Sequence, residues 1–154
     1  MADSMLGKLA RWLRVLGYDT HYQTYYGQGV IDQLVKQGRC LLSRHKDMAD
    51  HYANAVFLHD NNVGEQIAEL RQTVLLTPDQ STWFTRCLVC NALLEKPEET
   101  RARENVPEYI FYQNMAEIRF CPSCGRYYWP GSHRIRMLKQ LQEWGFHKSQ
   151  DPQD

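Results

Sequence analysis

The sequence predicts an α/β fold: a small, mainly parallel sheet flanked by helices, followed by a four-cysteine module and a C-terminal helix. Three observations predict it. Strand-like apolar runs alternate with helical patterns in the first part of the chain, and two Cys-x-x-Cys pairs lie in the second. The polar stretch TPDQSTW (77–83) separates the two patterns. We expect four parts: an α/β domain over 1–78, the cysteine module over 79–131, a helix over 132–146, and a disordered polar tail over 147–154.

The first helix is expected shortly after Asp3. Apolar residues recur at helical spacing and fall on one side, and Gly17 provides a natural end. The apolar side consists of Leu6, Leu9, Ala10, Leu13 and Leu16, and the opposite side carries Lys8, Arg11 and Arg14. From this pattern alone, an acidic residue ahead of an amphipathic helix is explained as its cap.

Further helices and strands complete the expected sheet. They are a helix with Ile31, Leu34 and Val35 on one face, a short buried strand RCLLS (39–43), a strand AVFLHD (55–60), and a helix over 63–71. Strands joined by helices form parallel sheets, in which ligands bind beyond the carboxyl ends of the strands. Asp3, the segment 43–47 and the segment 59–61 follow strands, so we expect the functional chemistry there.

The two Cys-x-x-Cys pairs are CLVC (87–90) and CPSCG (121–125), separated by 30 residues. Four thiolates at this spacing can complete a tetrahedral zinc shell, which leaves no open position for water and is therefore structural. Cys87, Cys90, Cys121 and Cys124 are the predicted ligands, with two redox pairs or two disulfides as the alternative. The segment between the pairs is expected to be too polar to form a core of its own.

Composition narrows the class of protein. The formal net charge is zero, and the local exception is a mildly basic surface over residues 119–148. The chain shows no signal peptide and no apolar run near the roughly 20 residues that cross a bilayer. We therefore expect a cytoplasmic protein without a membrane span.

Several motifs in order carry a family resemblance. They are DSMLGKLARWLR (3–14), LGYDT (16–20), GRCLLSR (38–44), RCLVCN (86–91), CPSCG (121–125) and YWPGSH (128–133). In these residues the chain resembles the Mut-seven C-terminal RNase-domain family, which joins a PIN-like nuclease domain to a zinc ribbon. The resemblance implies a PIN-like α/β fold with RNA as the partner.

The resemblance also implies carboxylates that hold Mg²⁺ or Mn²⁺ against an RNA phosphodiester. The family pattern places an acid after the first strand, a second at the start of the second helix, and a third in Thr-Arg-Asp. Asp3 matches the first, whereas the second helix begins Tyr-Gly-Gln-Gly (26–29) and the third motif reads Ser43-Arg44-His45. Asp47 and His45, or Asp32, are the possible replacements. The candidate catalytic residues are thus Asp3, His45 and Asp47.

Cationic side chains give the candidate RNA contacts. Lys8, Arg11 and Arg14 share one arc of the first helix, Arg44 follows a strand, and Arg134 lies in RYYWPGSHRIR (126–136), where aromatic rings alternate with arginines. The alternative is a solvated helix face and rings that pack internally. The leading hypothesis is a metal-dependent ribonuclease. Its rivals are an RNA-binding or ribosome-associated module whose nuclease site has decayed, and a zinc-ribbon adaptor for proteins.

Overall fold

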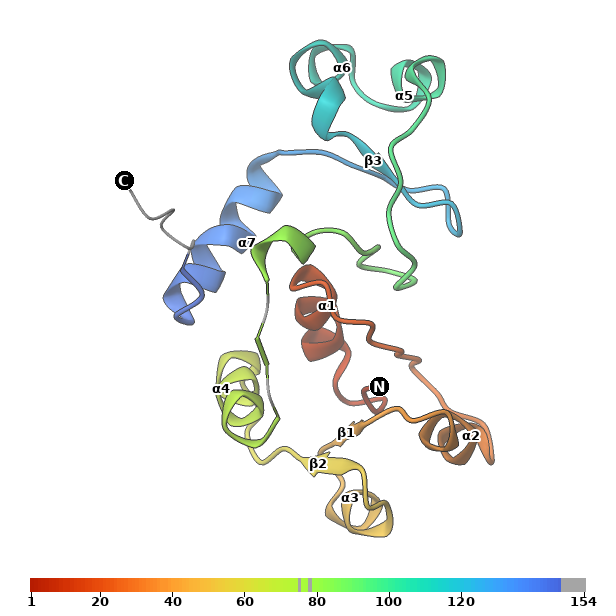
Figure 1. Ribbon diagram of the computed structural model, residues 1–154, viewed down its shortest axis with the longest axis vertical. Helices are drawn as coiled ribbons and strands as arrows, with labels where there is room; N and C mark the ends of the chain where they lie inside the picture. The colour runs from red at the N-terminus through yellow and green to blue at the C-terminus, as the bar shows by residue number, and fades with distance from the viewer. Residues whose placement is uncertain (75, 78, 148–154) are drawn as a thin grey trace. The chain divides into compact units, whose positions relative to one another are not determined.

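The computed structural model describes residues 1–74, 76–77 and 79–147 (Figure 1). They divide into two compact units, Met1–Phe84 and a second that begins at Thr85, and each is described by itself. The sequence places this division after residue 78. Of the predicted tail over 147–154, all but His147 lies outside the described residues.

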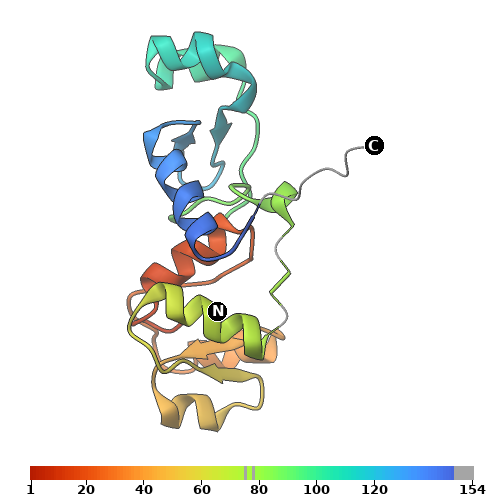
Figure 2. The same cartoon turned by 90° about the vertical axis from the view of Figure 1, so that its left-hand side faces the viewer.

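The first unit contains the α/β elements. They are α1 (Gly7–Val15), α2 (Val30–Lys36), β1 (Leu41–Ser43), α3 (Lys46–His51), β2 (Ala55–Phe57), α4 (Val63–Thr73) and the short 3-10 helix η1 (Gln80–Thr82). Figures 1 and 2 show α1 and α4 on one side of the strands and α3 on the other. The predicted α/β class is confirmed, but α3 was not expected from the sequence.

Parallel pairing places the N-terminal residues in the middle of the sheet. β1 pairs with β2 in parallel, with Leu42 opposite Val56. Ala2 forms parallel bridges to Leu42 on one side and to Tyr22 on the other. The order across the sheet is therefore the segment around Tyr22, the segment around Ala2, β1 and β2. Asp3 consequently lies at the carboxyl end of a central strand.

Helix α1 covers this sheet with the side that the sequence predicts. Leu6, Leu9, Ala10, Leu13 and Leu16 are all buried. Gly17 follows the last residues of the helix, and its φ of 93° is accessible to glycine at little cost. A Cβ at this position would lie 2.5 Å from the carbonyl oxygen of Thr82, so only glycine allows this close approach of the chain.

The second unit contains the four cysteines. Its elements are α5 (Glu99–Asn105), α6 (Glu108–Asn114), the 3-10 helix η2 (Met115–Glu117), β3 (Arg119–Phe120), β4 (Tyr127–Tyr128) and α7 (Ser132–Glu143). Strands β3 and β4 pair antiparallel around the second Cys-x-x-Cys turn. In α7, Met137 and Leu141 are buried whereas Ile135 is 67% exposed.

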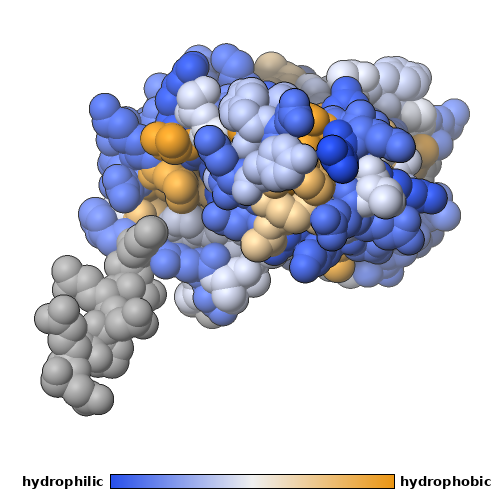
Figure 3. Space-filling model, turned by 90° about the horizontal axis from the view of Figure 1, so that it is seen from above, coloured by the Kyte–Doolittle hydropathy of each residue, from blue (hydrophilic) through white to orange (hydrophobic). Residues whose placement is uncertain are grey.

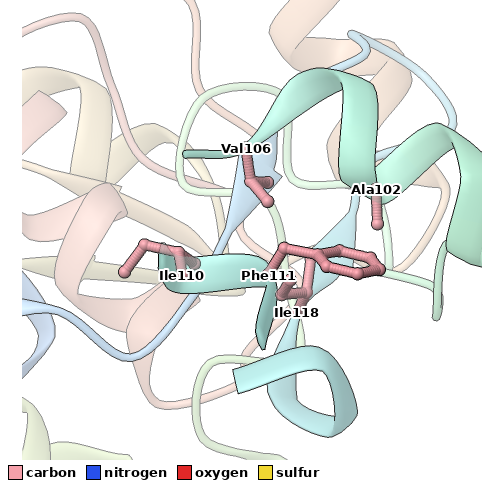
Figure 4. Packing of buried hydrophobic residues seen from close by; sticks show 5 residues of the cluster. All are labelled: Ala102, Val106, Ile110, Phe111 and Ile118. Atoms are coloured by element: carbon pink, nitrogen blue, oxygen red, sulfur yellow. The ribbon is translucent and has the colours of Figure 1, made fainter. Parts of the chain in front are cut away.

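The segment between the cysteine pairs forms a hydrophobic core, contrary to the sequence-based expectation. Figure 4 shows its five buried residues gathering between α5, α6 and the chain that follows: Ala102, Val106, Ile110, Phe111 and Ile118. The expectation was wrong because the segment is polar overall but contains a few apolar residues that pack together. Ala102 lies on α5, Ile110 and Phe111 lie on α6, and Val106 and Ile118 lie in the adjoining chain.

In the part of the chain that the structure describes, no helix has the length and apolar character needed to span a bilayer. The surface in Figure 3 is mainly hydrophilic, with small hydrophobic areas between polar side chains.

Candidate functional site

Asp3 is a buried carboxylate at the edge of the sheet where ligands bind in α/β folds. Its backbone amide donates to the Leu42 carbonyl at 3.0 Å, which fixes it beside the end of β1. Its side chain is 1% exposed. Asp3 is not the cap of α1, because Leu6 occupies the cap position and no side chain caps the helix.

Both carboxylate oxygens of Asp3 accept hydrogen bonds. Oδ1 accepts from the Met5 amide at 2.9 Å, and Oδ2 accepts from the Ser43 hydroxyl at 2.6 Å and the Arg44 amide at 2.9 Å. The Ser43 hydroxyl oxygen also accepts from the His45 amide at 2.9 Å. This network ties the turn before α1 to the turn after β1, so Asp3 has a structural role whatever else it does.

The proposed replacements do not gather around Asp3 as a metal site. His45 precedes α3 and Asp47 lies in its first turn, and both side chains are exposed. Asp32 accepts a hydrogen bond from the Tyr52 hydroxyl at 2.7 Å. Among the described residues, the four cysteines form the only group of three or more potential ligands close enough to hold an ion. Among the described residues, Asp3 is therefore not part of a group of three or more potential metal ligands.

The predicted cationic arc on α1 is only partly correct. Lys8 and Arg11 are exposed, but Arg14 is 4% exposed. Its Nε and Nη2 donate to the Thr20 carbonyl at 3.0 and 2.9 Å. The prediction of an exposed Arg14 is wrong because the chain returns over the end of α1 and buries it, which a pattern on one helix does not reveal.

The other two predicted RNA contacts lie in different surroundings. Arg44 follows β1, and its Nε is buried without a hydrogen-bond partner among the described residues. Arg134 lies on α7, and its Nη1 is 3.4 Å from a carboxylate oxygen of Glu117. The neighbouring rings of Tyr127 and Trp129 pack against the α5–α6 core. These contacts favour internal packing over base stacking for the two rings.

A pocket of about 390 Å³ opens at the start of α1. It is lined by Ser4, Met5, Leu6, Gly7, Lys8, Leu9, Tyr22, Asn61, Val63 and Gln66. The Tyr22 hydroxyl donates to the Ser4 carbonyl at 3.2 Å, and a Cβ on Gly7 would lie 2.7 Å from that hydroxyl. Glycine at position 7 thus lets the Tyr22 ring close one side of the pocket.

The backbone at this pocket offers hydrogen-bond donors. The first amides of any α-helix lack partners within the helix. Among the described residues, none accepts a hydrogen bond from the amides of Gly7, Lys8 or Leu9. Helix α4 begins at the same pocket with Val63. The pocket therefore combines a lysine with helix starts, an environment that favours anions.

The four cysteines form one compact cluster in the second unit. Their Sγ atoms all lie within 4.8 Å of one another. The Cys87–Cys124 and Cys90–Cys121 sulfur pairs are 3.6 and 3.4 Å apart. In tetrahedral zinc sites, Zn–S bonds of about 2.3 Å place the sulfurs about 3.8 Å apart. The cluster therefore fits a metal ion such as zinc, as the sequence predicts.

The thiols of this cluster differ in acidity. Burial raises the pKa of Cys121 to about 12. Burial acts in the same direction at Cys87, but hydrogen bonds from the Tyr128 hydroxyl and backbone amides outweigh it and lower the pKa to about 6. Burial, together with the hydrogen bond to Cys87, raises the pKa of Tyr128. Of these two thiols, Cys87 is thus the one that loses its proton more readily.

A family model described as the Mut7-C RNAse domain matches residues 1–141. The chain belongs to the Mut7-C RNAse domain family. This match confirms the resemblance drawn from the sequence motifs, and it covers both the α/β unit and the cysteine cluster. Searches of curated proteins and of solved structures found no match.

Sequence reasoning missed two features of this Mut7-C RNAse domain. The pocket combines residues 4–9 with Tyr22 and with the start of α4, and no local motif links those segments. The contact between Tyr128 and Cys87 joins residues 41 positions apart. A tyrosine close to a Cys-x-x-Cys motif is a weak signal, and the hairpin geometry was needed to identify its partner.

Proposed function

We propose that this protein binds RNA through its phosphate backbone at the α1 pocket, and that its cysteine cluster holds a structural zinc ion. Family membership supports RNA as the ligand. The pocket supports a phosphate contact, because Lys8 lines it together with residues whose first helical amides are unpaired among the described residues. This combination is the single observation that carries the proposal.

Arg44 extends the proposed contact surface toward the end of β1. Its backbone amide already binds the Asp3 carboxylate, whereas its Nε is buried without a partner among the described residues. A buried donor without a partner carries an energetic cost. A phosphate oxygen that paired with the guanidinium would relieve that cost.

The surroundings of Asp3 favour binding over cleavage. Metal-dependent hydrolysis of RNA needs carboxylate oxygens that are free to coordinate an ion near the scissile phosphate. The Asp3 oxygens are instead engaged by two backbone amides and one hydroxyl, and the side chain is buried. We therefore propose that Asp3, the acid retained from the family pattern, has a structural role here: its hydrogen bonds join the turn before α1 to the turn after β1.

A metal-dependent ribonuclease is the second candidate function. The family and the position of Asp3 at the carboxyl end of a central strand favour it. Mg²⁺ sites often use only one or two carboxylates together with substrate phosphates. In this alternative, Asp3 would exchange some of its hydrogen bonds for an ion when RNA binds.

The binding proposal is tested by fluorescence anisotropy with labelled single-stranded RNA over a series of salt concentrations. Lys8→Gln should weaken binding to RNAs of different sequence alike and lower the salt slope by about 0.7, the value for one phosphate contact on a single strand. Lys36→Gln is the matched control, because Lys36 is also exposed but lies in the last turn of α2. Equal effects of the two substitutions, or no RNA binding at low salt, would contradict the proposal.

The two candidate functions are separated by incubating the same RNA with Mg²⁺ and then with Mn²⁺. Salt-sensitive binding without cleavage supports the binding protein. Cleavage that Asp3→Asn abolishes while RNA binding persists supports the ribonuclease and overturns the structural assignment of Asp3.

A further inference from the structure

The two Cys-x-x-Cys turns share one backbone design. In the first turn, the Cys87 amide donates to the Ala92 carbonyl at 2.8 Å and the Asn91 amide to the Cys87 carbonyl at 3.0 Å. In the second, the Cys121 amide donates to the Arg126 carbonyl at 2.8 Å and the Gly125 amide to the Cys121 carbonyl at 2.9 Å. Asn91 and Gly125 both have positive φ, at 71° and 74°. The backbone therefore presents the two pairs of sulfurs equivalently.

One side chain breaks this equivalence. Tyr128 ends β4, which belongs to the hairpin around the second turn, yet its hydroxyl lies 3.1 Å from Sγ of Cys87 in the first turn. Leu94 occupies the corresponding place after the first turn and carries no hydrogen-bonding side chain. The second hairpin therefore provides a hydroxyl to a sulfur of the first turn, and the first hairpin has no equivalent side chain at the corresponding position.

We infer that Tyr128 is a positioning residue of the metal centre, whose hydroxyl donates a hydrogen bond to the metal-bound Cys87 thiolate and sets the affinity for zinc. The direction of the bond follows from the chemistry of the ligand. A cysteine that binds zinc does so as a thiolate and has no proton to donate. The phenol hydroxyl must therefore be the donor.

This hydrogen bond has an orienting and an electrostatic effect. Groups that hydrogen-bond to metal ligands fix the ligand's position, and their removal commonly lowers metal affinity by 10-fold to 100-fold. Cys87 is buried, so water cannot easily replace the missing donor. The role does not depend on RNA binding, because every group involved belongs to the cysteine cluster and its hairpins.

The test compares Tyr128→Phe with Tyr127→Phe in the full-length protein. Tyr127 is the neighbouring residue of β4, and its ring packs against Phe120 and the α5–α6 core. Both substitutions remove one hydroxyl and keep the ring, so a shared effect reports on packing and a difference reports on the hydrogen bond. Zinc affinity is measured by competition with a chromophoric chelator. The ¹¹³Cd NMR shift of cadmium-loaded protein reports directly on the sulfur ligands.

We expect Tyr128→Phe to weaken zinc binding about 10-fold or more and to shift the ¹¹³Cd resonance, with Tyr127→Phe close to wild type in both measurements. If Tyr128→Phe binds zinc within about twofold of wild type, the hydroxyl does not set the affinity. Equal weakening by both substitutions would assign the effect to ring packing and would also overturn the inference. A ¹¹³Cd resonance that is the same in Tyr128→Phe and wild type would show that the hydroxyl does not contact the ligand.

Discussion

The sequence predicts metal ligands at two places, and the structure brings the predicted ligands together at only one of them. At the cysteine cluster all four predicted side chains converge, and their sulfurs point at one another. At the end of the central strand, Asp3 is present but its predicted partners His45 and Asp47 are exposed side chains at the start of α3. One site has a complete ligand set, and the other has a single member.

The hydrogen bonds around the two predicted sites also differ. Around Cys87, the Tyr128 hydroxyl and a backbone amide are directed at the sulfur, an arrangement that supports a metal ligand. Around Asp3, the donors satisfy the carboxylate itself. These hydrogen bonds stabilise the buried Asp3 carboxylate in the absence of a metal ion, because a buried charge must be paired or hydrogen-bonded.

The largest expected effect comes from breaking the complete site. Cys121→Ser should abolish stoichiometric zinc binding, because Cys121 is fully buried and one of only four ligands. Structural zinc contributes on the order of 10 kcal/mol of apparent binding energy at neutral pH, so the cysteine-bearing turns should unfold. Elemental analysis and limited proteolysis measure the two losses.

Cys40→Ala is the control for that substitution. Cys40 belongs to the first unit and lies outside the cluster, so the zinc content of the Cys40→Ala variant should stay at the wild-type level. Wild-type zinc content in Cys121→Ser, or loss of zinc in Cys40→Ala, would show that the cluster does not hold the ion as described.

Asp3→Asn should have a smaller effect on stability. The substitution keeps the shape but removes the charge that accepts from the Ser43 hydroxyl and two backbone amides. Loss of charge-assisted hydrogen bonds in a buried site should lower the free energy of unfolding by about 2 kcal/mol. Urea-induced unfolding of the zinc-loaded protein measures this change.

The sign of that change bears on the comparison of the two sites. Carboxylates that are kept for function are often held at a cost, and their replacement stabilises the protein. An Asp3→Asn variant that is as stable as wild type, or more stable, would therefore identify Asp3 as a functional group. The two sites would then differ less than their hydrogen bonds indicate.

The fold could largely be predicted because its signals are local. The apolar side of α1 was predicted residue by residue, and β1 and β2 fall within the predicted apolar runs. Helices α5 and α6 were missed because each is a seven-residue helix with few apolar positions. Their stability comes from packing against each other and against Ile118, which sequence periodicity does not report.

The candidate site could be predicted only in part, for a related reason. The four cysteines were identified because their spacing within each turn already encodes the metal geometry. The burial of Arg14 depends on Thr20 in the returning chain, and the state of Asp3 depends on Ser43, 40 residues away. Contacts with other segments of the chain determine both the burial of Arg14 and the hydrogen bonding of Asp3. The helical pattern of α1 does not contain these contacts, and it therefore predicted an exposed Arg14.

The smallest expected effect concerns the pair formed by Asp3 and Ser43. Ser43→Ala removes the shortest hydrogen bond in this network, at 2.6 Å, and leaves the His45 amide without its acceptor. We expect a loss of about 1 kcal/mol in the free energy of unfolding, and a smaller loss when the substitution is made in the Asp3→Asn background. A double-mutant cycle by urea unfolding gives the coupling between the two residues.

The chain offers a matched control for this pair. Ser81 donates to Asp79 at 2.7 Å, so the same two side-chain types are joined at nearly the same distance, but both residues are exposed. Ser81→Ala should therefore change stability much less than Ser43→Ala, because water replaces the lost partner. Additive effects of Ser43→Ala and Asp3→Asn would mean that the two side chains are energetically independent. The connection between the turn before α1 and the turn after β1 would then depend on the backbone amides of Met5 and Arg44 alone.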